Sequence, residues 1–221
     1  MKLPHQAISH LRFLLDKGYS SGQALQIIGN RYQLNSWERK WLERGVCSIK
    51  QAKIRERKKK GLWRLRQAKL GIDGHNVLIT IESAIKGKPL LLADDGFIRD
   101  MAGVSASYQP SSTTEKALEL IFEVLKLYQP LWLDWYFDAP LSFSGELAAN
   151  VRKKLKDYHL SGTAQAVPVP EHYLIHHELI ATSDSALIDI CSEVIDLAGE
   201  VLKFCGFSFS LFKFKNLNVN E

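Results

Sequence analysis

From residue 69 onward, short apolar runs alternate with amphipathic stretches, and this alternation restricts the fold more than any other feature of the chain. Five runs have the length and composition of buried strands: 69–73, 89–93, 131–137, 164–169 and 179–182. Four stretches carry apolar residues at helical spacing: 77–85, 112–128, 144–158 and 185–191. Strands that alternate with helices form a mostly parallel sheet with helices on both faces. We therefore expect an α/β domain over residues 61–221.

The first 60 residues have a different texture, that of short helices with capping residues before them. This part of the chain is also strongly basic. Residues 1–69 hold 17 Lys and Arg against 4 Asp and Glu, a balance of +13, whereas residues 70–221 hold 12 against 20, a balance of −8. The net charge of +5 hides this division. We expect a small all-α basic domain over residues 1–60, which ends in a charged helix or linker.

A run of cations joins the two parts. Ten Lys and Arg stand against Glu56 alone between residues 50 and 69, and like charges at this density repel unless something neutralises them. The run is either a solvated linker helix or an arm that contacts the phosphates of RNA. The acidic face of a second copy could also neutralise it, which leaves a homodimer open. The candidate RNA-binding residues are Lys53, Arg55, Arg57, Lys58, Lys59, Lys60, Arg64 and Arg66.

Several classes of protein are disfavoured by the sequence. No apolar run reaches the 18 or so residues that a membrane span needs, and the first residues hold no apolar signal core. The three cysteines are odd in number and lack metal-type spacing, so we expect reduced thiols and a cytoplasmic protein without a membrane partner. Neither a P-loop, a dinucleotide fingerprint nor a Gly-x-Ser-x-Gly elbow is present.

Three of the predicted strands end in an aspartate: Asp73, Asp138 and Asp184. The carboxyl ends of parallel strands meet at one edge of a sheet, which is where open α/β sheets keep their sites. Each aspartate by itself is explained as a turn or a helix cap. Three together would repel without a counterion. Because hard oxygen ligands favour Mg²⁺ or Mn²⁺, we expect these catalytic acids to hold one of these ions.

Other residues are expected to complete the site. Asp189 follows Asp184 across the first turn of a helix and is a candidate fourth metal ligand. Asp95 and Asp100 are candidates for a second acidic rim, with Arg99 paired to one of them. The residues expected to surround the ligands are Asn76, Asp95, Glu146 and Ser183. A zinc site at the three histidines of residues 172–177 is disfavoured, because structural zinc needs four convergent ligands.

The segment Ile72-Asp73-Gly74-His75-Asn76-Val77 resembles the first motif of PIN-like ribonuclease domains, particularly the NYN branch. Residues 181–189 resemble a later motif of the same family, in which a small polar pair and an aspartate end a strand. The resemblance implies a metal-dependent nuclease fold over about residues 69–205, with Asp73 and Asp184 as metal ligands and Asn76 beside them. Asp189 is carried over less directly, since the spacing in that motif varies.

The whole chain also resembles an uncharacterised prokaryotic family that joins a small helical domain to a PIN-like domain. Residues 15–19, 29–32 and 94–100 carry this second likeness. We therefore expect a Mg²⁺- or Mn²⁺-dependent endoribonuclease. Two alternatives stay open: an inactive RNA-binding or RNA-processing accessory protein, and a phosphohydrolase that acts on small phosphate esters.

Overall fold

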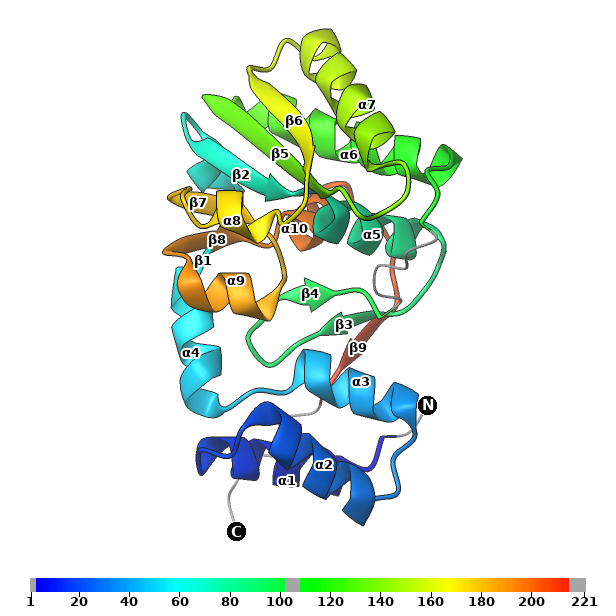
Figure 1. Ribbon diagram of the computed structural model, residues 1–221, viewed down its shortest axis with the longest axis vertical. Helices are drawn as coiled ribbons and strands as arrows, with labels where there is room; N and C mark the ends of the chain where they lie inside the picture. The colour runs from blue at the N-terminus through cyan, green and yellow to red at the C-terminus, as the bar shows by residue number, and fades with distance from the viewer. Residues whose placement is uncertain (1–2, 102–107, 215–221) are drawn as a thin grey trace.

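The computed structural model describes residues 3–101 and 108–214. A parallel sheet with helices on both faces forms the larger part of the molecule, and a layer of helices from the beginning of the chain lies at one end of it (Figure 1). The expected fold class, an α/β domain preceded by a helical region, is confirmed.

The main sheet has six parallel strands in the order β1-β8-β7-β2-β5-β6. Their bounds are β1 Lys59–Lys60, β2 Lys69–Asp73, β5 Trp132–Asp138, β6 Gly162–Val167, β7 Leu179–Ala181 and β8 Glu193–Ile195. In β2, Asp73 is level with Tyr136 of β5, and Ile72 is level with Ala181 of β7. The strands β7, β2 and β5 are therefore neighbours, and the expected acids follow directly at or after their carboxyl ends.

The two faces of the sheet are covered by different helices. One face packs against α5 (Gly74–Ile85), α6 (Ser112–Tyr128), α7 (Ser144–Asp157) and α10 (Leu197–Phe204) through the largest apolar cluster of the molecule. The other face packs against α8 (Glu171–Leu174) and α9 (Ser185–Ile190), together with the ring of Phe97. Because side chains alternate along a strand, successive residues of β5 enter the two clusters in turn, as Trp135 and Tyr136 do.

The helical region comprises α1 (His5–Asp16), α2 (Ser21–Arg31), α3 (Ser36–Gly45) and α4 (Ile49–Lys58). Ser20, Asn35 and Ser48 cap the last three of these through their side-chain oxygens, as their residue types predict. The core of this region is not self-contained, since Leu91 and Phe214 from the rest of the chain are buried in it. The two parts of the molecule therefore share an apolar interface.

A second, small sheet lies between the helical layer and the main sheet (Figure 1). It consists of β4 (Ile98–Arg99), β3 (Leu90–Leu92) and β9 (Leu211–Lys213), in that order. β9 pairs with β3 in parallel, so the Phe-rich segment at residues 207–214 supplies the edge strand of this sheet. Phe212 and Phe214 of this tail pack on the helical region, and the ring of Phe212 meets Trp41 edge-on at 4.9 Å.

Some element boundaries differ from those expected. The charged helix ends at Lys58, and the next two lysines form the edge strand β1 on β8. The helix after β2 begins at Gly74 rather than Val77, because Asp73 is its cap. The short strand β8 at Glu193–Ile195 was not among the expected strands, and α10 begins two residues after it.

Among the described residues, no helix is long and apolar enough to cross a membrane. The three cysteines are free, in agreement with the expectation of reduced thiols.

Candidate functional site

A cavity of about 190 Å³ lies at the carboxyl ends of β2, β5 and β7. The three strand-end aspartates, Asp73, Asp138 and Asp184, all line it. Three adjacent strands of one parallel sheet thus direct their terminal carboxylates to a common space, as the sheet geometry predicts. The other lining residues are Arg44, His75, Asn76, Ile79, Asp100, Pro170 and Glu171.

Asp73 is the most perturbed of the three acids. Its Oδ1 caps α5 by accepting from the backbone N–H of Asn76 (3.4 Å), and its Oδ2 accepts from the hydroxyl of Thr182 (2.9 Å). Burial, opposed by these hydrogen bonds but reinforced by the charges of Asp138 and Asp184, raises the pKa of Asp73 to about 7. Asp138 and Asp184 are therefore both close enough to Asp73 to disfavour its charged form.

Asp138 is held by a buried histidine. Oδ2 of Asp138 lies 2.9 Å from Nδ1 of His75, and its backbone nitrogen lies 3.0 Å from the same ring atom. The His75 ring is itself packed edge-on against Phe137 and Tyr108. His75, in the first turn of α5, thus fixes the carboxylate of Asp138 at the end of β5.

The loop between β7 and α9 is fixed to α5 by a set of short polar contacts. Oδ1 of Asn76 accepts from the backbone nitrogen (2.8 Å) and the hydroxyl (3.0 Å) of Ser183. Oδ1 of Asp184 caps α9 by accepting from the N–H groups of the second and third residues after it. Oδ2 of Asp184 has no hydrogen-bond partner among the described residues, and Asp184 lines the cavity.

The donor set fits a hard divalent cation held partly by water. Within residues 3–101 and 108–214, no three His, Cys, Asp or Glu side chains are grouped tightly enough to enclose an ion by themselves. Mg²⁺ usually keeps several waters and needs only one or two protein carboxylates. The mutual repulsion at Asp73 is the kind of conflict that a cation relieves. Asp73, Asp138 and Asp184 are the residues that could hold it.

Asp95 and Asp189, which were expected near the metal, are bound instead by two buried arginines. Asp95 binds Arg99 (2.8 Å) and Arg55 (3.0 Å), and Asp189 binds Arg55 (2.7 Å). Burial alone would raise the pKa of both acids, but the arginine hydrogen bonds and charges hold each pKa below its usual value. Neither acid lines the cavity. Asp189 points to α4 because Gln51 and Arg55 bind it there, which corrects the expectation that it reaches the metal.

Of the other charged residues expected near the metal, some line the cavity and others lie outside it. Arg99 pairs with Asp95, in agreement with the prediction that it would bind one of the two rim acids. Asp100 does line the cavity. Glu146 is exposed in the first turn of α7 and is not among the cavity-lining residues. An acidic side chain in the first turn of a helix interacts favourably with the helix dipole.

Part of the cationic run is neutralised by the acidic part of the same chain. Arg55 binds the two acids described above, and Lys58 donates to the carbonyl groups of Ile188 and Asp189 at the end of α9. The remaining contacts are Lys59 with Gly96 O and Asp196, Lys60 with Glu193, and Arg64 with Glu193 and Glu178. Across the described ranges, Lys53, Arg57 and Arg66 are exposed and form no ion pair.

Several cavity residues were missed by the reading of the sequence. His75 lies in the motif at residues 72–77, and Ile79 is three residues after Asn76 on the same helix, which was the signal that could have found it. Glu171 follows the predicted strand at 164–169, and its charge is the only feature of the sequence that could have indicated a role in the site. Arg44 lies in another part of the chain, and no local pattern connects it with the aspartates.

Comparison with known proteins adds two family matches. A model described as "Protein of unknown function (DUF434)" matches residues 5–60, and one described as "Domain of unknown function (DUF5616)" matches residues 62–200. The chain is also similar to the uncharacterized protein MJ0935 of Methanocaldococcus jannaschii, at 34% identity over 201 residues, which cover 90% of this chain and 96% of the relative. No solved structure matches. Since the second model spans more than half of the sequence, the protein belongs to the DUF5616 family.

Proposed function

We propose that the protein is a Mg²⁺- or Mn²⁺-dependent endoribonuclease. The observation that carries the proposal is the convergence of Asp73, Asp138 and Asp184, from three adjacent strands, on one cavity in which the charges of the other two raise the pKa of Asp73. The likeness of residues 72–77 and 181–189 to PIN-like domains of the NYN branch supports the same activity.

In the proposed reaction the three aspartates hold the ion. When it is bound, the metal supplies a water nucleophile of lowered pKa and stabilises the charge that develops on the scissile phosphate. The hydroxyl of Thr182 and the cap of α5 fix the orientation of Asp73, and His75 fixes that of Asp138. Asn76 fixes the loop that carries Asp184 through Ser183. These contacts keep the carboxylates in place before any ligand arrives, which lowers the cost of ordering the site.

RNA as substrate is supported by the basic helical region beside the cavity. The exposed cations Lys53, Arg57 and Arg66 are available for phosphate contacts, whereas four other cations of the run are paired with acids. A second candidate, a phosphohydrolase that acts on small esters, is favoured by the size of the cavity. A space of about 190 Å³ accommodates a phosphate group and little more of a substrate.

The test is cleavage of single-stranded and structured RNA with Mn²⁺ or with EDTA, by the wild type and by Asp73→Asn. We expect metal-dependent cleavage that the substitution lowers by at least about 100-fold, because the ion loses a ligand. Glu146→Gln is the matched control, since it removes an exposed carboxylate outside the cavity. Cleavage that persists in Asp73→Asn or in EDTA contradicts the proposal. Turnover of bis(p-nitrophenyl) phosphate without turnover of RNA supports the second candidate.

A further inference from the structure

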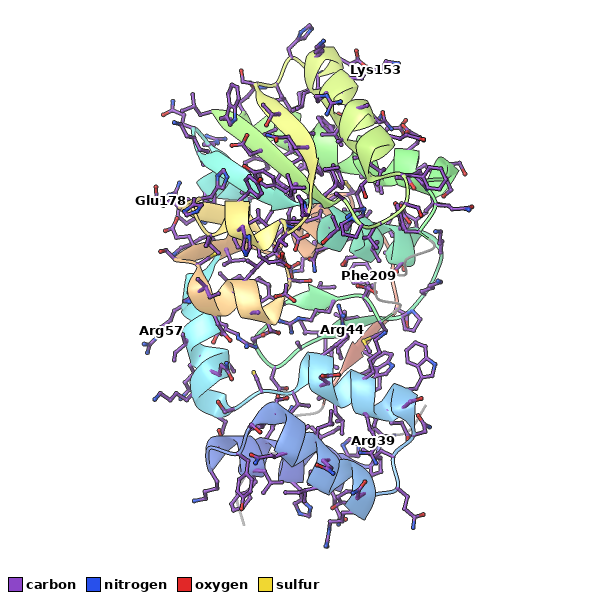
Figure 2. The ribbon with its side chains drawn as sticks, in the orientation of Figure 1. Arg39, Arg44, Arg57, Lys153, Glu178 and Phe209 are labelled. Atoms are coloured by element: carbon purple, nitrogen blue, oxygen red, sulfur yellow. The ribbon has the colours of Figure 1, made fainter. Side chains whose placement is uncertain are left out.

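One cation lines the acidic cavity, and it comes from the helical region. Arg44 lies in the last turn of α3 and is the only Lys or Arg among the described residues that line the cavity. The aspartates opposite it come from the α/β domain. In Figure 2, Arg44 is labelled on the side of α3 that faces this domain, whereas Arg57 projects outward from α4. The cavity is thus formed jointly by the two parts of the chain that the two family models match.

The position of Arg44 is fixed by a buried neighbour. Arg99 donates from Nη1 to the carbonyl oxygen of Arg44 (3.1 Å) and from Nε to the carbonyl oxygen of Ser183 (2.8 Å). Ser183 directly precedes Asp184, so one guanidinium group ties the end of α3 to the loop of a candidate metal ligand. Arg99 is itself held by two hydrogen bonds to Asp95. The distance between Arg44 and the acids is therefore set by the core of the molecule.

The next residue fixes the same helix end by close packing. A Cβ atom on Gly45 would lie 2.3 Å from the ring of Phe214 and 2.7 Å from a methyl group of Leu91. Only glycine allows the last turn of α3 to approach the small sheet so closely. The approach brings the preceding residue, Arg44, to the mouth of the cavity.

The guanidinium group of Arg44 has hydrogen-bonding capacity to spare. Its Nη2 lies 3.4 Å from Oδ1 of Asp100, which is long for a charged pair. Its Nε is buried and has no hydrogen-bond partner within the described residues. Nε is not accessible from the cavity, whereas the side chain as a whole is 29% exposed. An oxygen atom of a ligand in the cavity would therefore accept from the terminal nitrogens of the guanidinium group.

The chemistry of the lining indicates which ligand this is. An arginine fork matches the oxygens of a phosphate group and can bind two of them at once. The surrounding carboxylates would exclude an anion by charge unless a divalent cation offsets them. We propose that Arg44 binds a non-bridging phosphate oxygen of the substrate beside the metal, so that the helical region is an obligatory part of the site. This inference rests on the proposed metal-dependent function and adds to it the residue that recognises the phosphate.

The experiment separates binding of the metal from binding of the phosphate. Mn²⁺ affinity is measured for the full-length wild type, Arg44→Gln, Arg44→Lys, Arg31→Gln and Asp73→Asn, and the affinity of the Mn²⁺-loaded proteins for inorganic phosphate is then measured by calorimetry. Arg31→Gln is the charge-matched control, because it removes an exposed arginine of α2 that lies outside the cavity and outside the candidate RNA-binding residues. Arg44→Lys keeps the positive charge but removes the planar guanidinium group. It therefore tests whether phosphate binding needs the two-pronged geometry of arginine or only its charge.

We expect Arg44→Gln to bind Mn²⁺ at least as well as the wild type and phosphate about 10- to 100-fold more weakly, as for the loss of a charged hydrogen bond. Arg44→Lys should fall between them, and Arg31→Gln should match the wild type. Wild-type phosphate affinity in Arg44→Gln, or an equal loss in Arg31→Gln, overturns the inference and leaves the proposed function intact. Wild-type Mn²⁺ affinity in Asp73→Asn overturns the proposed function instead.

Discussion

Asp73 is both a helix cap and a cavity residue, and the two roles impose different charges on it. As a cap it accepts from the first turn of α5, which favours the carboxylate. As a cavity residue it is buried beside Asp138 and Asp184, which favours the protonated form and raises its pKa to about 7. Asp184 has the same double role at the start of α9. The structural and the functional interpretations of these aspartates are therefore compatible.

The raised pKa of Asp73 predicts how stability depends on pH. Between about pH 4 and pH 7 the native state retains a proton that the unfolded state releases, so this group destabilises the protein as the pH rises. Asparagine can cap the helix and never ionises. At pH 8, Asp73→Asn should be more stable than the wild type by about 1–3 kcal/mol, and the difference should shrink toward pH 4. Urea unfolding at both pH values measures it.

The control for this experiment is Glu146→Gln, whose exposed carboxylate lies outside the cavity and should give no pH-dependent difference. A wild type that gains stability relative to Asp73→Asn as the pH rises would contradict the assignment of a raised pKa.

Divalent ions should reverse this destabilisation. An ion that binds the native state alone stabilises it in proportion to the logarithm of its concentration above the dissociation constant. Because the ion competes with the proton at Asp73, Mn²⁺ should raise the melting temperature of the wild type more at pH 8 than at pH 5. The Asp73→Asn variant should show a much smaller rise. Equal shifts for both proteins at pH 8 would place the ion elsewhere, and thermal melts followed by circular dichroism decide between these outcomes.

At the scale of elements, the alternating pattern predicted the strands and helices that have their own apolar periodicity, such as β5 and α6. It could not predict β1, because Lys59 and Lys60 have no strand character of their own. They become a strand by pairing with β8, which lies more than 130 residues further along the chain. The same holds for the two residues of β4. Tertiary contacts rather than local propensity create these short elements.

The close approach of α3 to the small sheet gives a prediction for glycine. In Gly45→Ala the new methyl group meets Phe214 and Leu91 at distances that no real Cβ tolerates, and the overpacking should cost about 1–3 kcal/mol. Gly22→Ala is the control, because nothing lies within 4 Å of a Cβ in the first turn of α2. Urea unfolding should show a loss in the first variant and a small gain in the second. Equal stability of the two variants would show that Phe214 and Leu91 move aside to accommodate the methyl group.

At the scale of the whole molecule, the sequence predicted a basic part and an acidic part but not where their charges meet. The ion pairs of Arg55, Lys59 and Arg64 join residues that are more than 35 positions apart, and no local pattern reveals such pairing. For the same reason the site was predicted in part. The aspartates share a strand-end signal that can be read from the sequence, whereas Arg44 is brought to them by packing alone.

The internal pairing predicts a shallow salt dependence of RNA binding. On single strands each neutralised phosphate contributes about −0.7 to the slope of log K against log salt. Lys53, Arg57, Arg66 and Arg44 would together give about −3, whereas all eight candidate RNA-binding residues of the run with Arg44 would give about −6. Fluorescence anisotropy with the Asp73→Asn variant, which avoids cleavage, measures the slope. Replacing Lys53 and Arg57 by glutamine should bring it closer to zero, and a slope near −6 would mean that RNA displaces the internal ion pairs.

The burial of Phe214 among the first helices has a consequence for the order in which the molecule folds. The core of α1–α3 lacks this ring, and β3 lacks its partner β9, until segments that are far apart in the sequence have met. Contacts between such distant segments close long loops and slow folding, because the loop entropy is lost before the contacts form. We therefore expect the end of α3, with Arg44 beside Gly45, to reach its final position in a late folding step.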